Sequence, residues 1–154
     1  MSLPPTYEIK ATSLAYLRFI FNFVGVKYFP MIAGGLLGLL FLFASLAYFF
    51  KLASPPPPPE GSPMAMFMGA MHPTGYLDFV KVLELLGAVL IAIPMTRRMG
   101  LLVLGPIIIN ILAFHIFVAK GEGLANPMII VMTALALYLV WVERRAFTAF
   151  IRGC

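Results

Sequence analysis

Residues 31–50 read MIAGGLLGLLFLFASLAYFF, a run without a charged side chain. A helix needs roughly 20 predominantly apolar residues to cross the hydrocarbon core of a bilayer. This stretch therefore predicts a transmembrane helix. Within it, Gly34 and Gly38 have the small-xxx-small spacing that lets two membrane helices approach closely.

The composition of the whole chain agrees with this prediction. The 154 residues are 62% hydrophobic and only 11% charged, whereas a soluble domain has about 25% charged residues. The length fits one domain. The net charge of +5 includes no basic run longer than Arg97-Arg98 or Arg144-Arg145, so nucleic-acid binding is not expected. Because Cys154 is the one cysteine, no internal disulfide and no cysteine metal site are expected.

Three further apolar stretches are about long enough to cross a bilayer: residues 76–94, 99–119 and 127–142. Pro106 interrupts the second of these, and Pro127 suits the first turn of the last, where its missing N–H costs nothing. We therefore expect an all-α fold, a four-transmembrane-helix antiparallel bundle over residues 31–150.

The basic residues predict the orientation. With both termini on one side of the membrane, eight of the 11 Lys and Arg residues lie on that side. Cytoplasmic loops carry an excess of Lys and Arg, so both termini of this multi-pass protein are expected to be cytoplasmic. The eight are Lys10, Arg18, Lys27, Arg97, Arg98, Arg144, Arg145 and Arg152, and the other three are Lys51, Lys81 and Lys120.

Residues 1–30 are expected to form a cytoplasmic or interfacial segment. The run 11–30 is too polar for a comfortable span, because Arg18, Asn22 and Lys27 would enter the core. Arg18 and Asn22 belong, with three small residues, to a narrow small-or-polar stripe on an otherwise aromatic helix, which favours an amphipathic helix in the interface that turns at Pro30 into the first span. Docking of this helix onto a partner subunit through Arg18, Asn22 and Lys27 is the alternative.

The loop between the first two spans begins with five prolines and continues with a methionine-rich segment. Polyproline is stiff and extended. The methionines and the histidine after them suit an adaptable apolar lid, although thioether and imidazole ligands could also bind Cu(I). We favour the lid and expect no metal site; the residues concerned are Met64, Met66, Met68, Met71 and His72.

Ionisable residues stand out in the second span. Lys81 and Glu84 are three residues apart on one helix and can pair directly, and Asp78 can share the charge of Lys81. A rise of about 1.5 Å per residue places Lys81 about 7 Å and Glu84 about 12 Å from the outer end. In the antiparallel third span, His115 and Asn110 fall at about 6 and 13 Å. The matched depths predict one polar cluster in the outer half of the bundle.

Two interpretations of this cluster remain open. The ion pair can be self-satisfied and fix helix register, with Asn110 and His115 bonding across the interface. Alternatively, the cluster is a pocket in which Glu84 or His115 accepts a proton and Lys81 or Asn110 orients a carbonyl or hydroxyl ligand. Asn110 and His115 are separated by roughly 140° around a straight helix, so a distortion near Pro106 is needed if both face the same pocket.

The order of these segments resembles the DoxX family of small four-helix bacterial membrane proteins. The similarity covers about residues 31–150. It rests on LLGLLFLFASLAYFF, a Pro-rich loop, AMFMGAMHPTGYLDFVKVLELLGAVLIAIP, RRMGLLVLGPIIINILAFHIF and YLVWVERRAF, in that order. Its most specific parts are the Lys81–Glu84 pair and the run from Asn110 to His115.

The resemblance implies an inner-membrane helical bundle. Some DoxX relatives are similar to the small membrane subunit of a thiosulfate:quinone oxidoreductase, and others are linked to thiol or oxidative-stress systems. This chain has no redox cysteine pair and no dinucleotide or phosphate-binding motif, so any electron transfer would need a partner subunit.

We therefore expect a non-catalytic small membrane subunit of a larger quinone-linked redox assembly. The expected partners are the lipid bilayer and other subunits of a membrane complex. No covalently bound cofactor is expected, and a quinone or lipid is the candidate ligand. The alternatives are a purely structural accessory subunit packed around a membrane complex, or a small-molecule transporter or binding protein.

Overall fold

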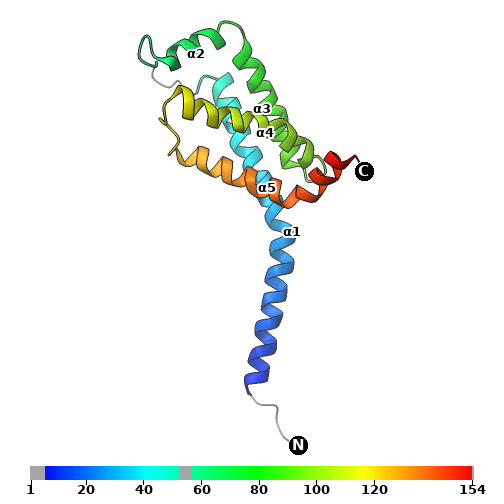
Figure 1. Ribbon diagram of the computed structural model, residues 1–154. Coiled ribbons are helices and arrows are strands. Elements are labelled where there is room, and N and C mark those ends of the chain that lie inside the picture. Colours follow the sequence, from blue (N-terminus) through cyan, green and yellow to red (C-terminus); the bar gives the residue numbers. More distant parts are fainter. Residues whose placement is uncertain (1–5, 53–56, 154) are drawn as a thin grey trace, which may run out of the picture.

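A computed structural model describes the backbone of residues 6–52 and 57–153, and the side chains of 28–52, 57–150, 152 and 153. The described part is helical and contains no strand. In chain order the helices are α1 (Thr6–Phe49), α2 (Pro63–Met71), α3 (Tyr76–Ala92), α4 (Arg97–Ala113), the π-helix η1 (Phe114–Val118) and α5 (Pro127–Arg152). Figure 1 shows α2 at the end of the molecule where α3 begins.

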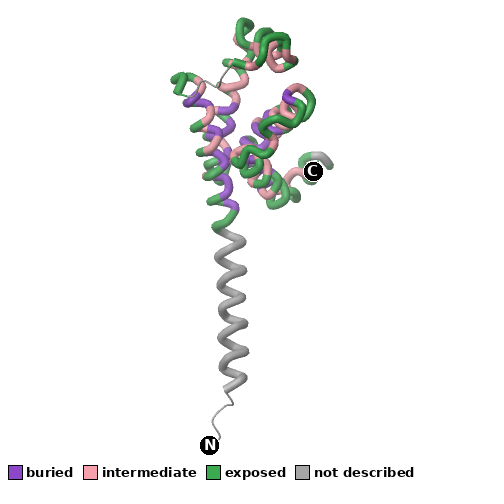
Figure 2. The backbone as a smooth tube through the Cα atoms, turned by 90° about the vertical axis from the view of Figure 1, so that its left-hand side faces the viewer, coloured by how far each residue is buried: buried purple, intermediate pink, exposed green. Residues whose placement is uncertain are grey.

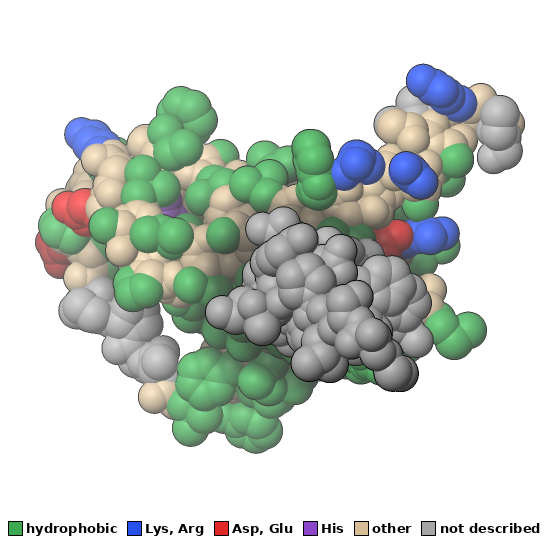
Figure 3. Space-filling view, turned by 90° about the horizontal axis from the view of Figure 1, so that it is seen from below, with side chains coloured by type: hydrophobic (Ala, Val, Ile, Leu, Met, Phe, Trp, Pro, Cys, Tyr) green, Lys and Arg blue, Asp and Glu red, His purple; other side chains and the backbone are tan. Residues whose placement is uncertain are grey.

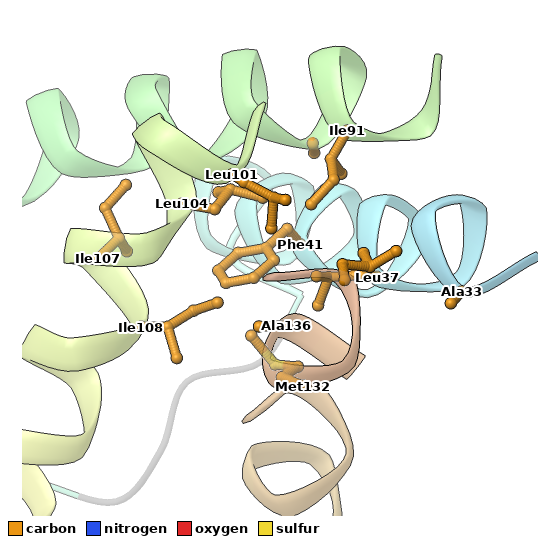
Figure 4. Close-up of a cluster of buried hydrophobic side chains, with 12 residues drawn as sticks. Ala33, Leu37, Phe41, Ile91, Leu101, Leu104, Ile107, Ile108, Met132 and Ala136 are labelled. Atoms are coloured by element: carbon orange, nitrogen blue, oxygen red, sulfur yellow. The ribbon is translucent and has the colours of Figure 1, made fainter. Parts of the chain in front are cut away.

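Four of these helices surround one hydrophobic core. Helix α1 contacts α3 and α5, and α4 contacts the same two helices. Figure 4 shows Phe41 of α1 among Leu104 and Ile108 of α4 and Ala136 of α5. The buried positions lie on the sides that face neighbouring helices, and exposed positions cover the outer sides (Figure 2).

Glycines set the distance between α1 and α3. A Cβ on Gly34 would lie 2.8 Å from the carbonyl oxygen of Ile91, and one on Gly38 would lie 2.6 Å from that of Ala88. Neither distance leaves room for a methyl group, so the two backbones are in direct contact at these positions. The close helix contact predicted from the Gly34–Gly38 spacing is confirmed, and its partner is α3.

Three of the helical segments are long and apolar enough to cross a membrane: Tyr28–Phe49, Arg97–Val118 and Pro127–Phe150. They correspond to three of the four predicted spans and fit a multi-pass membrane protein. The fourth predicted span forms α3, which has 17 residues. This length lies at the lower end of what a bilayer core requires, roughly 17–25 residues.

The predicted turn at Pro30 is wrong, because α1 is a single helix with Pro30 inside it. Proline fixes φ at a helical value, so it removes one backbone hydrogen bond without having to end the helix, and membrane helices tolerate such a loss. The side chains of Arg18, Asn22 and Lys27 lie outside the described residues. Their interfacial or partner-docking role stays a prediction.

The last helix begins as its sequence predicts. Pro127 is in the first turn of α5, and the side chain of Asn126 accepts a hydrogen bond from the backbone N–H of Met128 at 2.9 Å. An asparagine cap followed by proline satisfies an N–H that the helix itself leaves unpaired. The start of α5 is therefore encoded locally.

Candidate functional site

An ion pair within α3 forms the centre of the site. The Nζ of Lys81 lies 2.7 Å from Oε2 of Glu84. Glu84 is only 3% exposed, whereas the side chain of Lys81 is 23% exposed. A spacing of three residues places both side chains on one face of a helix, so the predicted pairing is confirmed. The carboxylate is inside the bundle and the ammonium lies at its edge.

Helix α1 supplies a second partner for the buried carboxylate. The hydroxyl of Ser45 is fully buried and donates a hydrogen bond to Oε2 of Glu84 at 3.2 Å. Ser45 continues the buried stripe of α1 that includes Leu37 and Phe41, each four residues from the next. The hydrogen bond therefore joins α1 to α3 at the level of the ion pair.

Ser45 was not among the site residues predicted from the sequence. Its position indicates an interhelical contact, because a hydroxyl four residues after Phe41, on the helix face that contains Gly38, faces a neighbouring helix. A serine in a helix can equally bond to its own backbone. The spacing alone therefore did not reveal that Ser45 contacts Glu84.

A second polar contact lies closer to the end of the bundle. The hydroxyl of Tyr48 donates a hydrogen bond to Oδ1 of Asp78 at 2.8 Å. The Nζ of Lys81 lies 5.8 Å from the centre of the Tyr48 ring, within range of a cation–π interaction. The ring of His72 lies 6.3 Å from the same ring. Tyr48 thus connects Lys81, Asp78 and the residue that follows α2.

These contacts leave Lys81 with unused donor capacity. An ammonium group has three N–H donors, and its hydrogen bond within the described residues goes to Glu84. The group is also partly exposed, with a carboxylate on one side and an aromatic ring on the other. Such an ammonium can donate to a carbonyl or hydroxyl oxygen of a ligand while Glu84 holds it in place.

Asn110 and His115 do not join this cluster. Asn110 is exposed, because α4 turns Leu104, Ile107 and Ile108 toward the core. Its side chain makes no hydrogen bond with the described residues. The four-residue cluster predicted from matched depths is therefore not formed, since equal depth does not determine which way a helix faces.

His115 has a local environment of its own. It lies in η1, where its Nδ1 is 2.8 Å from the carbonyl oxygen of Ile111. A carbonyl only accepts, so Nδ1 carries the proton in this contact. The other edge of the ring lies against Gly123, where an added Cβ would be 2.9 Å from Cδ2. The π-helix places His115 beside the α4–α5 loop, where its carbonyl oxygen accepts a hydrogen bond from the N–H of Gly121.

The methionine-rich segment folds as α2 and packs beside η1. The rings of Phe67 and Phe114 are 5.1 Å apart, and the hydroxyl of Ser62 caps α2 by accepting a hydrogen bond from the N–H of Ala65. Helix α2 has no buried residue. Among the described residues, no group of three His, Cys, Asp or Glu side chains could hold a metal ion.

Part of the chain is similar to a known bacterial protein. No family model matches the chain, and no solved structure matches it. The uncharacterized protein YwoB of Bacillus subtilis (strain 168) is 34% identical over 86 residues, which make up 56% of this chain and 53% of YwoB. The match therefore spans about half the length of that relative.

Proposed function

We propose that this chain is a non-catalytic, multi-pass membrane subunit that holds a quinone or similar lipid-soluble ligand for a larger redox assembly. The assembly role is taken from the resemblance of the sequence motifs to those of DoxX proteins, which is itself part of the proposal. Three long apolar helices support the membrane setting. In this proposal α3 crosses as well, in a bacterial inner membrane with both termini cytoplasmic.

The observation that carries the ligand proposal is the position of Lys81. A charged side chain within a membrane segment costs about 2.5–3.5 kcal/mol on insertion scales, and such residues generally mark functional sites. Lys81 donates one hydrogen bond to Glu84, and its remaining N–H donors lie at an edge of the bundle. A quinone carbonyl oxygen is an acceptor that suits them, and the exposed apolar surface of α3 next to the site suits a hydrocarbon ring and tail.

Each residue of the site has its own role in holding the ligand. Lys81 donates to the ligand oxygen. Glu84 neutralises and orients Lys81, and Ser45 fixes Glu84. Asp78, held by Tyr48, keeps the outer end of the site acidic. None of these groups transfers electrons, so a redox partner must supply or remove them.

Purification in mild detergent tests the proposal. Organic extraction and mass spectrometry measure the quinone per protein in the wild type, in Glu84→Gln and in the matched control Glu122→Gln. Glu122 is exposed in the α4–α5 loop. We expect Glu84→Gln to lower quinone content roughly tenfold, because a charge-assisted hydrogen bond contributes about 1.5–3 kcal/mol, while Glu122→Gln retains it.

Two results would contradict the proposal. Equal quinone content in all three proteins would make the ion pair purely architectural. Wild-type protein that purifies alone, without quinone and without stoichiometric partner subunits, would remove both the ligand and the assembly role.

A second candidate function is a purely structural accessory subunit. The observation that favours it is the Ser45 hydrogen bond, because it gives the buried carboxylate a partner on a neighbouring helix. In that case the Lys81–Glu84 pair serves to align α3 with α1. Partner subunits would then copurify without a quinone, and Glu84→Gln would lower stability only.

A further inference from the structure

A second polar cluster lies toward the other end of the four helices. Arg97, the first residue of α4, is only 6% exposed. Its Nη1 is 3.8 Å from Oε1 of Glu143 on α5, which is too long for a hydrogen bond. Its Nε is buried and has no hydrogen-bond partner among the described residues. A buried guanidinium with an unsatisfied N–H and a distant carboxylate is costly unless another charge compensates it.

The space around Arg97 is made by a glycine. A Cβ on Gly34 of α1 would lie 3.1 Å from Nε of Arg97. The absence of a side chain there lets the guanidinium lie against the α1 backbone. Three helices, α1, α4 and α5, therefore contribute to the surroundings of this cation, and the described residues give its Nε no acceptor at hydrogen-bond distance.

The charges at this end do not balance. Glu143 is shared, and its Oε2 lies closer to Arg98, at 2.8 Å from Nε. Two guanidinium groups thus face one carboxylate at the positive N-terminus of α4. Arg144 and Arg145 add further positive charge on α5. Figure 3 shows Lys and Arg side chains gathered around an acidic one on this face.

An aromatic residue indicates the membrane level of the cluster. Trp141, two residues before Glu143, is 66% exposed, and the guanidinium of Arg144 lies 4.2 Å from its ring centre. Exposed tryptophan is enriched where hydrocarbon meets head groups. Phosphates of lipids lie just outside this level, and basic sites between membrane helices bind anionic head groups.

We propose that Arg97 and Arg98 bind the phosphate of an anionic phospholipid at the start of α4. The phosphate oxygens accept hydrogen bonds from the exposed guanidinium of Arg98 and from the small exposed part of the Arg97 side chain, and they balance the excess positive charge that Glu143 leaves. Guanidinium groups bind phosphate through two parallel hydrogen bonds. This proposal requires that the chain is inserted in a membrane, but it does not depend on the ligand site at Lys81. Each of the two proposals can therefore be refuted without the other.

Native mass spectrometry of the detergent-solubilised protein tests the site by titration with phosphatidylglycerol, phosphatidylcholine and inorganic phosphate. We expect one phosphatidylglycerol per chain, bound at least about tenfold more tightly than phosphatidylcholine. Arg97→Gln should weaken phosphatidylglycerol binding by a similar factor. The matched control Arg145→Gln removes the same charge from an exposed position on α5 and should change binding by less than about twofold.

A variant with the opposite sign keeps the test decisive if Arg97→Gln does not fold. Glu143→Gln removes the carboxylate that competes with the lipid, so phosphatidylglycerol should bind more tightly. Weaker or unchanged binding in Glu143→Gln would overturn the proposal, as would equal losses in Arg97→Gln and Arg145→Gln. Displacement of the lipid by millimolar inorganic phosphate would overturn the assignment to a phospholipid and indicate a free-anion site.

Discussion

Glu84 receives hydrogen bonds from two helices, from Lys81 within α3 and from Ser45 on α1. A buried carboxylate is expensive unless it is paired and hydrogen-bonded. The two donors therefore do different things. Lys81 balances the charge, and Ser45 ties the charged pair to a neighbouring helix.

At the residue scale, replacing Ser45 by alanine should destabilise the protein by roughly 0.5–2 kcal/mol, the range found for polar contacts between membrane helices. Unfolding of the purified protein by SDS titration in mixed micelles measures the change. Thr133→Ala is the matched control, since the Thr133 hydroxyl donates to Ile129 in its own helix. Equal stability losses in the two variants would contradict a specific α1–α3 contact.

The residues of the site were predictable to different extents. Lys81 and Glu84 were predictable because residues three apart meet on any helix. Asn110 was placed wrongly because sequence depth gives the height of a residue and not the direction of its helix face. His115 lies in the π-helix η1, and no spacing in the sequence predicts a π-helix at this position. In the sequence, Arg97 served only as one of the basic residues that predict membrane orientation. Its burial was not predictable, because it depends on Gly34 from another helix.

At the element scale, the close approach of α1 and α3 depends on which glycine faces the neighbour. Gly38 faces α3, where an added Cβ would meet Ala88 and Ala92. Gly35 is in the same helix, yet nothing lies within 4 Å of the corresponding Cβ position. The sequence showed the Gly34–Gly38 spacing, but three adjacent helices were possible partners.

Gly38→Ala should therefore destabilise the protein by about 1–3 kcal/mol, the usual cost of overpacking. Gly35→Ala should be neutral or stabilising by up to about 1 kcal/mol, because alanine restricts the unfolded chain more than glycine. The same SDS titration measures both. A similar loss in the two variants would mean that helix propensity, and not the α1–α3 contact, governs this region.

The extents of the other helices were largely predictable from length and apolar composition. Residues 99–119 cover most of α4 and all of η1, which ends at Val118, and residues 127–142 fall within α5, which continues to Arg152. The failure at Pro30 has a physical cause. Proline disfavours a helix locally, but it does not prevent one that long apolar flanks continue.

At the scale of the whole molecule, the described parts of α1, α3, α4 and α5 all carry large apolar side chains on the outer surface. Exposed large side chains include Phe43 on α1, Phe79 on α3, Ile109 on α4 and Leu137 on α5. Soluble proteins rarely expose contiguous apolar patches of this kind. A bilayer provides the matching environment, and α3 carries exposed large apolar residues from Tyr76 to Val89.

In the proposed topology, α3 crosses the membrane and carries Lys81 and Glu84 within it. Its two flanks, at Thr74 and Met95, must then lie on opposite sides. Both positions are exposed, and Met95 is 94% so. Because Cys154 is the one native cysteine, a Cys154→Ser background allows single cysteines to be placed at either flank and at Glu122 as a control.

Labelling of intact cells with an impermeant maleimide is the most direct measurement. We expect Thr74→Cys and Glu122→Cys to react from outside, and Met95→Cys to react only after the cells are permeabilised. Reaction of Thr74→Cys and Met95→Cys from the same side would contradict this topology, because α3 would then not cross the membrane and the ion pair would lie outside the bilayer.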